Sequence, residues 1–123
     1  MSTLTENSVR TLVDELNGMI LQGQILDAFD KFYAENVVMS DNGVDPREGK
    51  ATNRAYEEAF VGGLTAFRGA EIKNIAVNEE TGVAMVEWFF DYTHKDWGDM
   101  TYTQVAVQHW QDGQIIKETF YHA

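Results

Sequence analysis

Three side chains stand in the sequence at places where they could transfer protons, and Asp41 is the first of them. It directly follows the apolar run Val37, Val38 and Met39, so we expect it at the end of a short buried strand. Beside aromatic side chains its charged form would be costly, and desolvation would bring its proton affinity into the range of a general base. The alternative interpretation is a solvated aspartate that caps the turn at residues 41–43.

Glu118 and His122 form a second and weaker pair of candidates. They stand four residues apart on a predicted strand, where alternate side chains share a face, so a carboxylate–imidazole couple inside a cavity is one possibility. The alternative is that His122, the penultimate residue, points into solvent.

Composition argues against several other chemistries. The chain has no cysteine, which excludes disulfides, thiolate nucleophiles and sulfur-ligated metals. Its three histidines lack the spacing of metal ligands, and it has no glycine-rich phosphate loop, so we expect neither a metal nor a cofactor. The formal net charge of −11 disfavours nucleic acid and anionic membranes as partners. No apolar run could span a bilayer and the N-terminus does not resemble a signal peptide, so we expect a cytoplasmic protein.

The elements that would position these side chains fall into two halves. Helical spacing of apolar residues predicts helices over 9–20, from 25 to about 33, and over 50–64, with Thr5 or Ser8 as the first cap. A short strand is expected over 36–40, followed by a loop over 41–49. Alternation from residue 67 onward, with turns at 79–82, 97–99 and 111–113, predicts consecutive hairpins. Helices followed by hairpin-linked strands indicate an α+β fold with the helices on one face of an antiparallel sheet.

Segment 105–121 resembles the closing hairpin of the nuclear transport factor 2-like superfamily, in its SnoaL-like and ketosteroid-isomerase-like branches. Trp110 there precedes the turn Asp112–Gly113, an apolar pair follows, and an aromatic cluster ends the strand. Segments 27–41 and 47–60 also resemble the family's second helix with its strand, and its glycine followed by a helix. The resemblance implies a single domain over 1–123: three helical segments on a strongly curved, mostly antiparallel sheet, a cystatin-like α+β barrel whose cone holds a pocket.

The resemblance also implies a function and limits it. The family binds small molecules, and its isomerases, cyclases and dehydratases act on apolar or aromatic substrates by acid–base chemistry; a non-catalytic ligand carrier or assembly module is the alternative. In the isomerase branch the aspartate at the place of Asp41 is the base. The two oxyanion donors of that branch fall at Leu16 and Gln108, which cannot serve in that way, so steroid-type enolisation is not expected. Tyr92 or Tyr102 could replace the missing donor.

Strand parity then predicts which residues line the pocket. In the family, the residue at the place of Gln108 faces inward, and Trp110 lies at the rim of the same face. Because alternate residues of a strand share a face, the inward residues of the neighbouring strands follow, and they include Ile116 and Glu118 on the last strand. A small apolar or aromatic ligand would contact the following residues: Tyr56, Phe60, Trp88, Phe90, Tyr92, Tyr102, Gln104, Gln108 and Trp110.

The opposite face of the sheet predicts a homodimer. Phe89, Val105 and Val107 would gather there into an apolar patch, which usually marks an interface. Glu87 and Asp91 share that face and would repel their copies across a twofold axis unless a basic side chain, Lys117 or His109, lay opposite them.

Overall fold

The helices α2, α3 and α4 are Val9–Leu21, Ile25–Phe32 and Lys50–Gly63 in the computed structural model, which describes residues 8–123. Ser8 caps α2, because its hydroxyl accepts a hydrogen bond from the Thr11 amide at 3.1 Å. Thr5, the other candidate cap, lies outside the described residues. The chain reverses after α2 at Gly23, whose φ of 81° suits glycine. None of the helices in the described part is long and apolar enough to cross a membrane.

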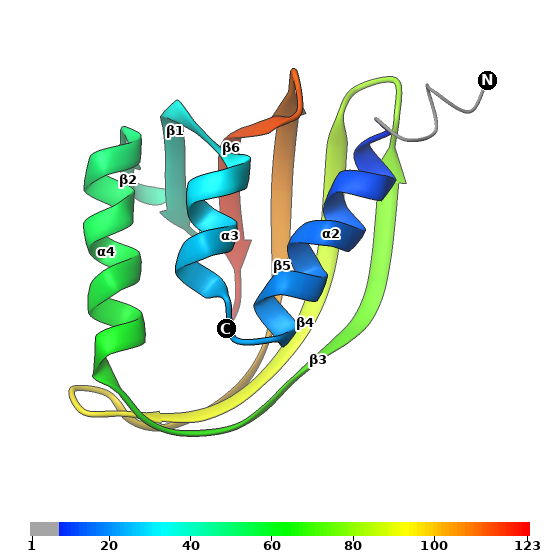
Figure 1. Cartoon of the computed structure of the whole chain (residues 1–123). Coiled ribbons are helices and arrows are strands. Elements are labelled where there is room, and N and C mark those ends of the chain that lie inside the picture. The colour runs from blue at the N-terminus through cyan, green and yellow to red at the C-terminus, as the bar shows by residue number, and fades with distance from the viewer. Residues whose placement is uncertain (1–7) are drawn as a thin grey trace.

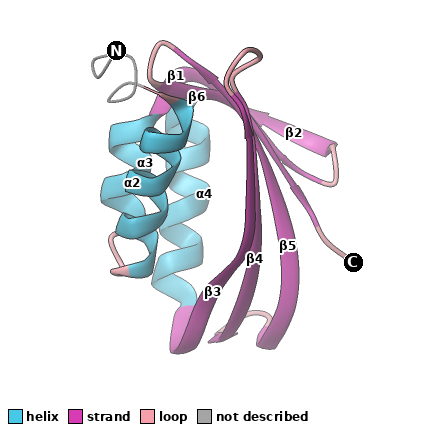
Figure 2. Cartoon of the chain, turned by 90° about the vertical axis from the view of Figure 1, so that its right-hand side faces the viewer, coloured by secondary structure: helices cyan, strands magenta, loops and turns pink. Residues whose placement is uncertain are grey.

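Six strands form one curved, open sheet. They are β1 Tyr33–Asp41, β2 Val44–Glu48, β3 Leu64–Asn78, β4 Val83–His94, β5 Gly98–Gln111 and β6 Gln114–Tyr121. Their order across the sheet is β2-β1-β6-β5-β4-β3, and every neighbouring pair is antiparallel except β1 and β6. The sheet curls beneath the helices (Figure 1), and all three helices lie on the same face of it (Figure 2). The predicted α+β class is thus confirmed.

The expected loop over residues 41–49 is wrong, because most of it forms strand β2. Asn42 and Gly43 both have positive φ, 55° and 73°, and make a tight turn that returns the chain along β1. Met39 pairs with Arg47 across this hairpin. Pro46 is tolerated because β2 is an edge strand, where a missing backbone donor leaves no neighbouring strand unpaired.

The core lies between the helices and the concave face of the sheet. Leu16 of α2 and Phe29 of α3 pack there with Trp88 of β4, and all three are almost fully buried. Phe32 of α3 meets Trp110 of β5 edge to face within the same core, with ring centroids 5.8 Å apart.

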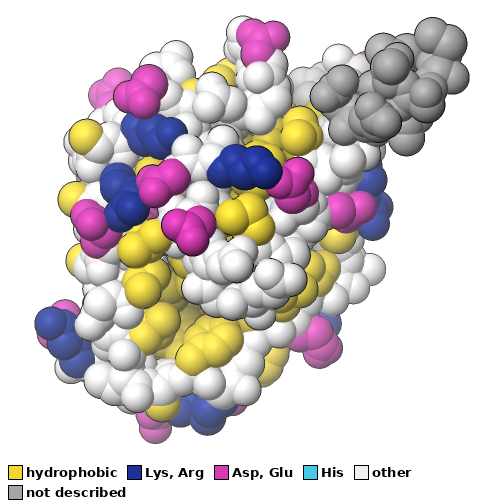
Figure 3. Space-filling view, viewed as in Figure 1, with side chains coloured by type: hydrophobic (Ala, Val, Ile, Leu, Met, Phe, Trp, Pro, Cys, Tyr) yellow, Lys and Arg dark blue, Asp and Glu magenta, His cyan; other side chains and the backbone are white. Residues whose placement is uncertain are grey.

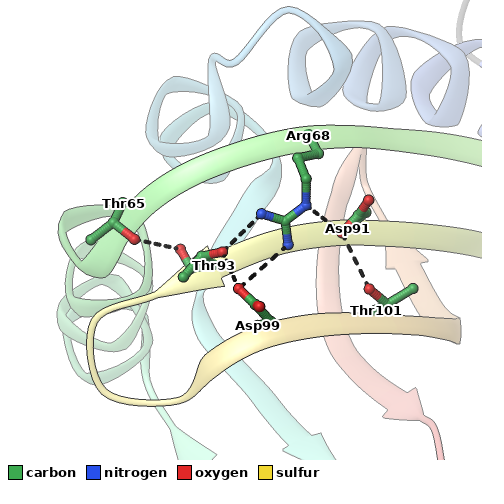
Figure 4. Close-up of polar contacts among 6 residues, drawn as sticks. All are labelled: Thr65, Arg68, Asp91, Thr93, Asp99 and Thr101. Atoms are coloured by element: carbon green, nitrogen blue, oxygen red, sulfur yellow. Dashed lines mark hydrogen bonds and ion pairs between the residues drawn. The ribbon is translucent and has the colours of Figure 1, made fainter.

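The convex face carries a polar network at the end near the β4–β5 hairpin (Figure 4). Arg68 of β3 reaches across β4, where its Nε lies 2.8 Å from Asp91 Oδ1 and its Nη1 lies 2.8 Å from Thr93 Oγ1. Thr101 of β5 donates to the same Asp91 oxygen at 3.2 Å. The charge of Asp91 is therefore compensated within its own chain.

Candidate functional site

A cavity of about 800 Å³ lies between the helices and the concave face of the sheet. On the helix side, hydrophobic side chains surround a hollow in the molecular surface (Figure 3). The structure brings eleven of the twelve predicted site residues into its lining: Asp41, Tyr56, Phe60, Trp88, Phe90, Tyr92, Tyr102, Gln104, Gln108, Glu118 and His122.

Trp110 is the exception. It lies on the inward face of β5, as parity predicts, but it is buried against Phe32 in the core and does not line the cavity. Parity gives the face of a strand on which a residue lies, but not whether the cavity extends to that position along the strand.

Glu118 lies at the buried end of the cavity and is held by hydrogen bonds on both carboxyl oxygens. The Tyr33 hydroxyl donates to Oε1, and Gln108 Nε2 donates to Oε2 at 2.9 Å. The Trp110 indole, which can only donate, bonds Gln108 Oε1 at 3.0 Å, so it fixes the orientation of the Gln108 amide. The result is a directed chain of hydrogen bonds from Trp110 through Gln108 to Glu118.

Burial gives Glu118 an unusual proton affinity. Its residue is only 2% exposed, and desolvation raises its pKa from 4.5 to about 7, although the hydrogen bonds from Tyr33 and Gln108 act in the opposite direction. The same burial, together with the nearby Glu118 charge, raises the pKa of Tyr33 well above its usual value, so Tyr33 stays a donor. Glu118 can therefore exchange a proton near neutral pH.

Glu57 of α4 is a further cavity residue that sequence reasoning missed. It lines the same cavity as Glu118, and desolvation raises its pKa from 4.5 to about 7, with Arg47 opposing the rise and Asp41 adding to it. A signal was present, because Glu57 precedes Phe60, a predicted cavity residue, by three residues on the helix and therefore shares its face. The neighbouring aromatic residues of α4 drew the sequence interpretation away from it.

Asp41 lies near the open side of the cavity in a cluster of charged groups. Its side chain is 39% exposed, and its carboxylate oxygens lie 3.4 Å from Arg47 Nη1 and 3.4 Å from His122 Nε2. The Arg47 guanidinium stacks on the Tyr56 ring at 3.9 Å and donates from Nε to Asn53 Oδ1 at 3.2 Å. Asp41 therefore lies inside the site but is only partly desolvated. Its partner is the Arg47 guanidinium, which Tyr56 and Asn53 hold in place.

Two tyrosines on neighbouring strands face the cavity together. The hydroxyl oxygens of Tyr92 and Tyr102 lie 2.8 Å apart, in hydrogen-bonding distance. Desolvation raises the pKa of both phenols above the usual value, most strongly that of Tyr102. Both therefore remain protonated, and the pair can orient an oxygen atom of a bound molecule.

The predicted couple of Glu118 and His122 does not form. Four residues along an extended strand cover about 13 Å, so two such side chains share a face without meeting. His122 contacts Asp41, while Glu118 contacts Tyr33 and Gln108.

The inward placement of Ile116 is also wrong. Between β5 and β6 the register shifts, so that Trp110 pairs with Ile115 while His109 pairs with Lys117. One extra residue on β6 reverses the parity beyond it, and Ile115 is the residue that enters the core.

The lining of the cavity supplies carboxyl, phenol, amide and guanidinium groups among aromatic faces. Such a surface can hold a small organic molecule and move protons on it. Within residues 8–123, no three histidine or acidic side chains gather so that they could hold a metal ion.

This architecture also occurs in a known family of domains. The sequence profile of the SnoaL-like domain matches residues 9–118. No curated protein matches the chain in sequence.

Solved structures show the same fold at low identity. A candidate SnoaL-like polyketide cyclase from Mesorhizobium loti superimposes with a TM-score of 0.80 at 19% identity, covering 93% of this chain and 98% of its own. A candidate isomerase from Bacillus subtilis has a TM-score of 0.76 at 14% identity, with 97% and 88% covered. A nuclear transport factor 2-like protein of unknown function from Burkholderia xenovorans has a TM-score of 0.75 at 15% identity, with 98% and 86% covered.

Proposed function

The chain belongs to the SnoaL-like domain family, within the nuclear transport factor 2-like superfamily, and we propose that it is an acid–base enzyme acting on a small apolar or aromatic carbonyl compound. The observation that carries the proposal is Glu118, a buried carboxyl group in the cavity wall that changes protonation near neutral pH. A general base is most effective when its pKa lies near the working pH.

In the proposed reaction, Glu118 removes a proton from the carbon next to the carbonyl group. Each of its oxygens accepts one hydrogen bond and keeps a second lone pair for this proton. The donors Tyr33 and Gln108 hold the carboxylate in place, so little reorganisation precedes the transfer. Isomerisation, aldol-type cyclisation and dehydration all begin with this step, and the proposal covers all three.

Asp41, the base favoured by the sequence, has a different role in this proposal. Its two oxygens face Arg47 and His122, so it positions the guanidinium at the open side of the cavity. Tyr92 and Tyr102, whose hydroxyl groups face the cavity, orient the carbonyl oxygen. Aromatic side chains on several elements bind the apolar body of the substrate.

Two structural neighbours support this class of chemistry. One is described as a candidate polyketide cyclase and the other as a candidate isomerase. Aldol-type cyclisation and isomerisation by a proton shift both begin with the step assigned to Glu118.

The test follows solvent deuterium exchange at the α-carbon of 2-tetralone, an aromatic ketone with acidic protons, by proton NMR. We expect the wild type to catalyse exchange and Glu118→Gln to be at least about 100-fold slower, the usual contribution of a general base. Glu58→Gln is the matched control, because Glu58 lies on α4 with its side chain 58% exposed and pairs with Arg54. Exchange that is equally fast in the wild type and in Glu118→Gln would overturn the assignment.

A ligand carrier is the second candidate function, favoured by the mainly aromatic and aliphatic lining of the cavity. A carrier would bind 2-tetralone tightly, as measured by calorimetry, without catalysing exchange at any pH.

We further propose that the protein is a homodimer through the convex face of the sheet. Phe89, Val105 and Val107 lie on this face and are only partly buried in the single chain. Of the acidic residues expected to oppose dimerisation, Asp91 is compensated by Arg68, and Glu87 accepts a hydrogen bond from Asn74 at 2.8 Å.

A further inference from the structure

Glu57 is a carboxyl group in the cavity wall without a partner. Its side chain forms no hydrogen bond and no ion pair with any residue of the part of the chain that the structure describes. The residue is only partly buried and its carboxyl group lines the cavity, so this group is free to bond a molecule held there.

Glu57 and Glu118 face the same cavity from different walls, one on helix α4 and one on strand β6. Their hydrogen bonds differ in a way that assigns different protonation states. Glu118 accepts two hydrogen bonds, which favour its charged form, whereas Glu57 accepts none. When the cavity holds a single proton for the two groups, Glu57 is the residue expected to keep it.

We infer that Glu57 is the general acid of this site, which donates its proton to the carbonyl oxygen of the substrate while Glu118 removes the proton from carbon. The inference rests on the proposed function and adds a second catalytic residue to it.

The step is balanced in atoms and charge. The C–H electron pair forms the carbon–carbon double bond of an enol, and the π pair of the carbonyl group takes the proton of Glu57. Glu118 ends protonated and Glu57 ends charged, so the net charge in the cavity does not change. In a low-dielectric cavity this avoids an isolated oxyanion, whose stabilisation would otherwise need dedicated donors.

This chain lacks the donors that the isomerase branch uses for that purpose. Leu16, at the first donor position, has no polar side chain, and the Gln108 amide, at the second, donates to Glu118. Glu57 supplies a transferable proton from another wall of the same cavity.

Burial is the main reason that the protonated form of Glu57 is favoured. Among the neighbouring charges, Arg47 of β2 opposes that form more strongly than Asp41 supports it. On the side of Glu118, the charge of Glu57 raises the pKa of Glu118, so the two groups titrate as a coupled pair.

The experiment measures the pH profile of 2-tetralone deuterium exchange for the wild type, Glu57→Gln and Glu58→Gln. We expect a bell-shaped profile for the wild type, because Glu118 must be charged and Glu57 protonated. Glutamine can donate a hydrogen bond but has no acidic proton, so Glu57→Gln should lose the alkaline limb and fall about 10- to 100-fold at its maximum. Its acidic limb should stay close to that of the wild type, because Glu57 is protonated and uncharged on that side of the bell. Glu58→Gln should keep the bell-shaped pH profile of the wild type.

A second readout does not depend on turnover. In protein with 13C-labelled glutamate carboxyl groups, the NMR signal that disappears in Glu57→Gln identifies Glu57, and we expect it to titrate near pH 7. Titration below pH 5, or an intact bell-shaped profile in Glu57→Gln, would overturn the inference. If the profile stays intact while Glu118→Gln abolishes exchange, the proposed function stands and only the role of Glu57 is refuted. Absence of exchange in the wild type would refute both.

Discussion

Replacing Glu118 with glutamine should change how the stability of the protein depends on pH. In the native state the pKa of Glu118 is about 7, against 4.5 for an ordinary glutamate, so the folded chain binds this proton more tightly than the unfolded chain does. The stability that this proton contributes is complete below pH 4.5 and is lost as the pH rises through 7.

The magnitude follows from the two pKa values. One pH unit corresponds to about 1.4 kcal/mol, so the change from 4.5 to about 7 corresponds to roughly 3 kcal/mol between acidic and alkaline pH. Glutamine cannot ionise, so this loss is absent in the variant. At low pH the variant should be less stable, by about 1–3 kcal/mol, because an amide nitrogen replaces one carboxyl oxygen and cannot accept the hydrogen bond that Tyr33 or Gln108 donates there. Above pH 7.5 the difference should shrink or reverse.

The assay is urea unfolding of the wild type and Glu118→Gln from pH 5 to 8.5, plotted as the difference in free energy of unfolding. Carboxyl groups that do not interact with Glu118, which excludes the coupled Glu57, titrate alike in both proteins and cancel in this difference. Glu58→Gln serves as the control, since its exposed side chain should give a difference that hardly changes with pH. A difference for Glu118→Gln that is flat across this range would refute the titration assigned to Glu118.

Two further predictions concern packing and assembly. A Cβ atom at Gly63 would lie 2.1 Å from His94 Nε2, so Gly63→Ala should lower the free energy of unfolding, measured in urea, by about 1–3 kcal/mol. Gly62→Ala is the control and should not lower it, because the space around Gly62 is open. Equal stabilities of the two variants would contradict the close contact at Gly63. If the convex face forms the dimer, Val107→Glu and Phe89→Glu should sediment as monomers of 13.9 kDa at micromolar concentration while the wild type sediments at twice that mass.

The sequence predicted the fold and most of the cavity lining because both depend on periodicity. The family resemblance gave the inward face at Gln108, and strand alternation then placed Trp88, Tyr92 and Gln104 on the cavity side without knowledge of the sheet order. The family resemblance, which the match of the SnoaL-like domain over residues 9–118 confirms, added the expectation of a curved sheet and a pocket. Periodicity therefore predicts the surroundings of a residue wherever these depend only on the face of the strand on which the residue lies.

What could not be predicted depends on position along an element or on contacts between distant segments. Trp110 and the pair of Glu118 with His122 show the first limit, since alternation ignores the rise along a strand. The choice of Glu118 over Asp41 shows the second, because the Tyr33 hydroxyl is 85 residues away in sequence. Only the folded chain shows which carboxylate is desolvated and which is paired with a cation.

The parallel pairing of β1 with β6 has a consequence for how this chain folds. β6 is the last strand in sequence, yet it lies third in the sheet, between β1 and β5. The contacts that join the two halves of the sheet therefore close a loop of about 80 residues, which slows folding of small domains. Until that strand arrives, β1 presents an unpaired edge, so we expect a ribosome-bound chain that lacks β6 to be open to misassociation and to have no assembled cavity.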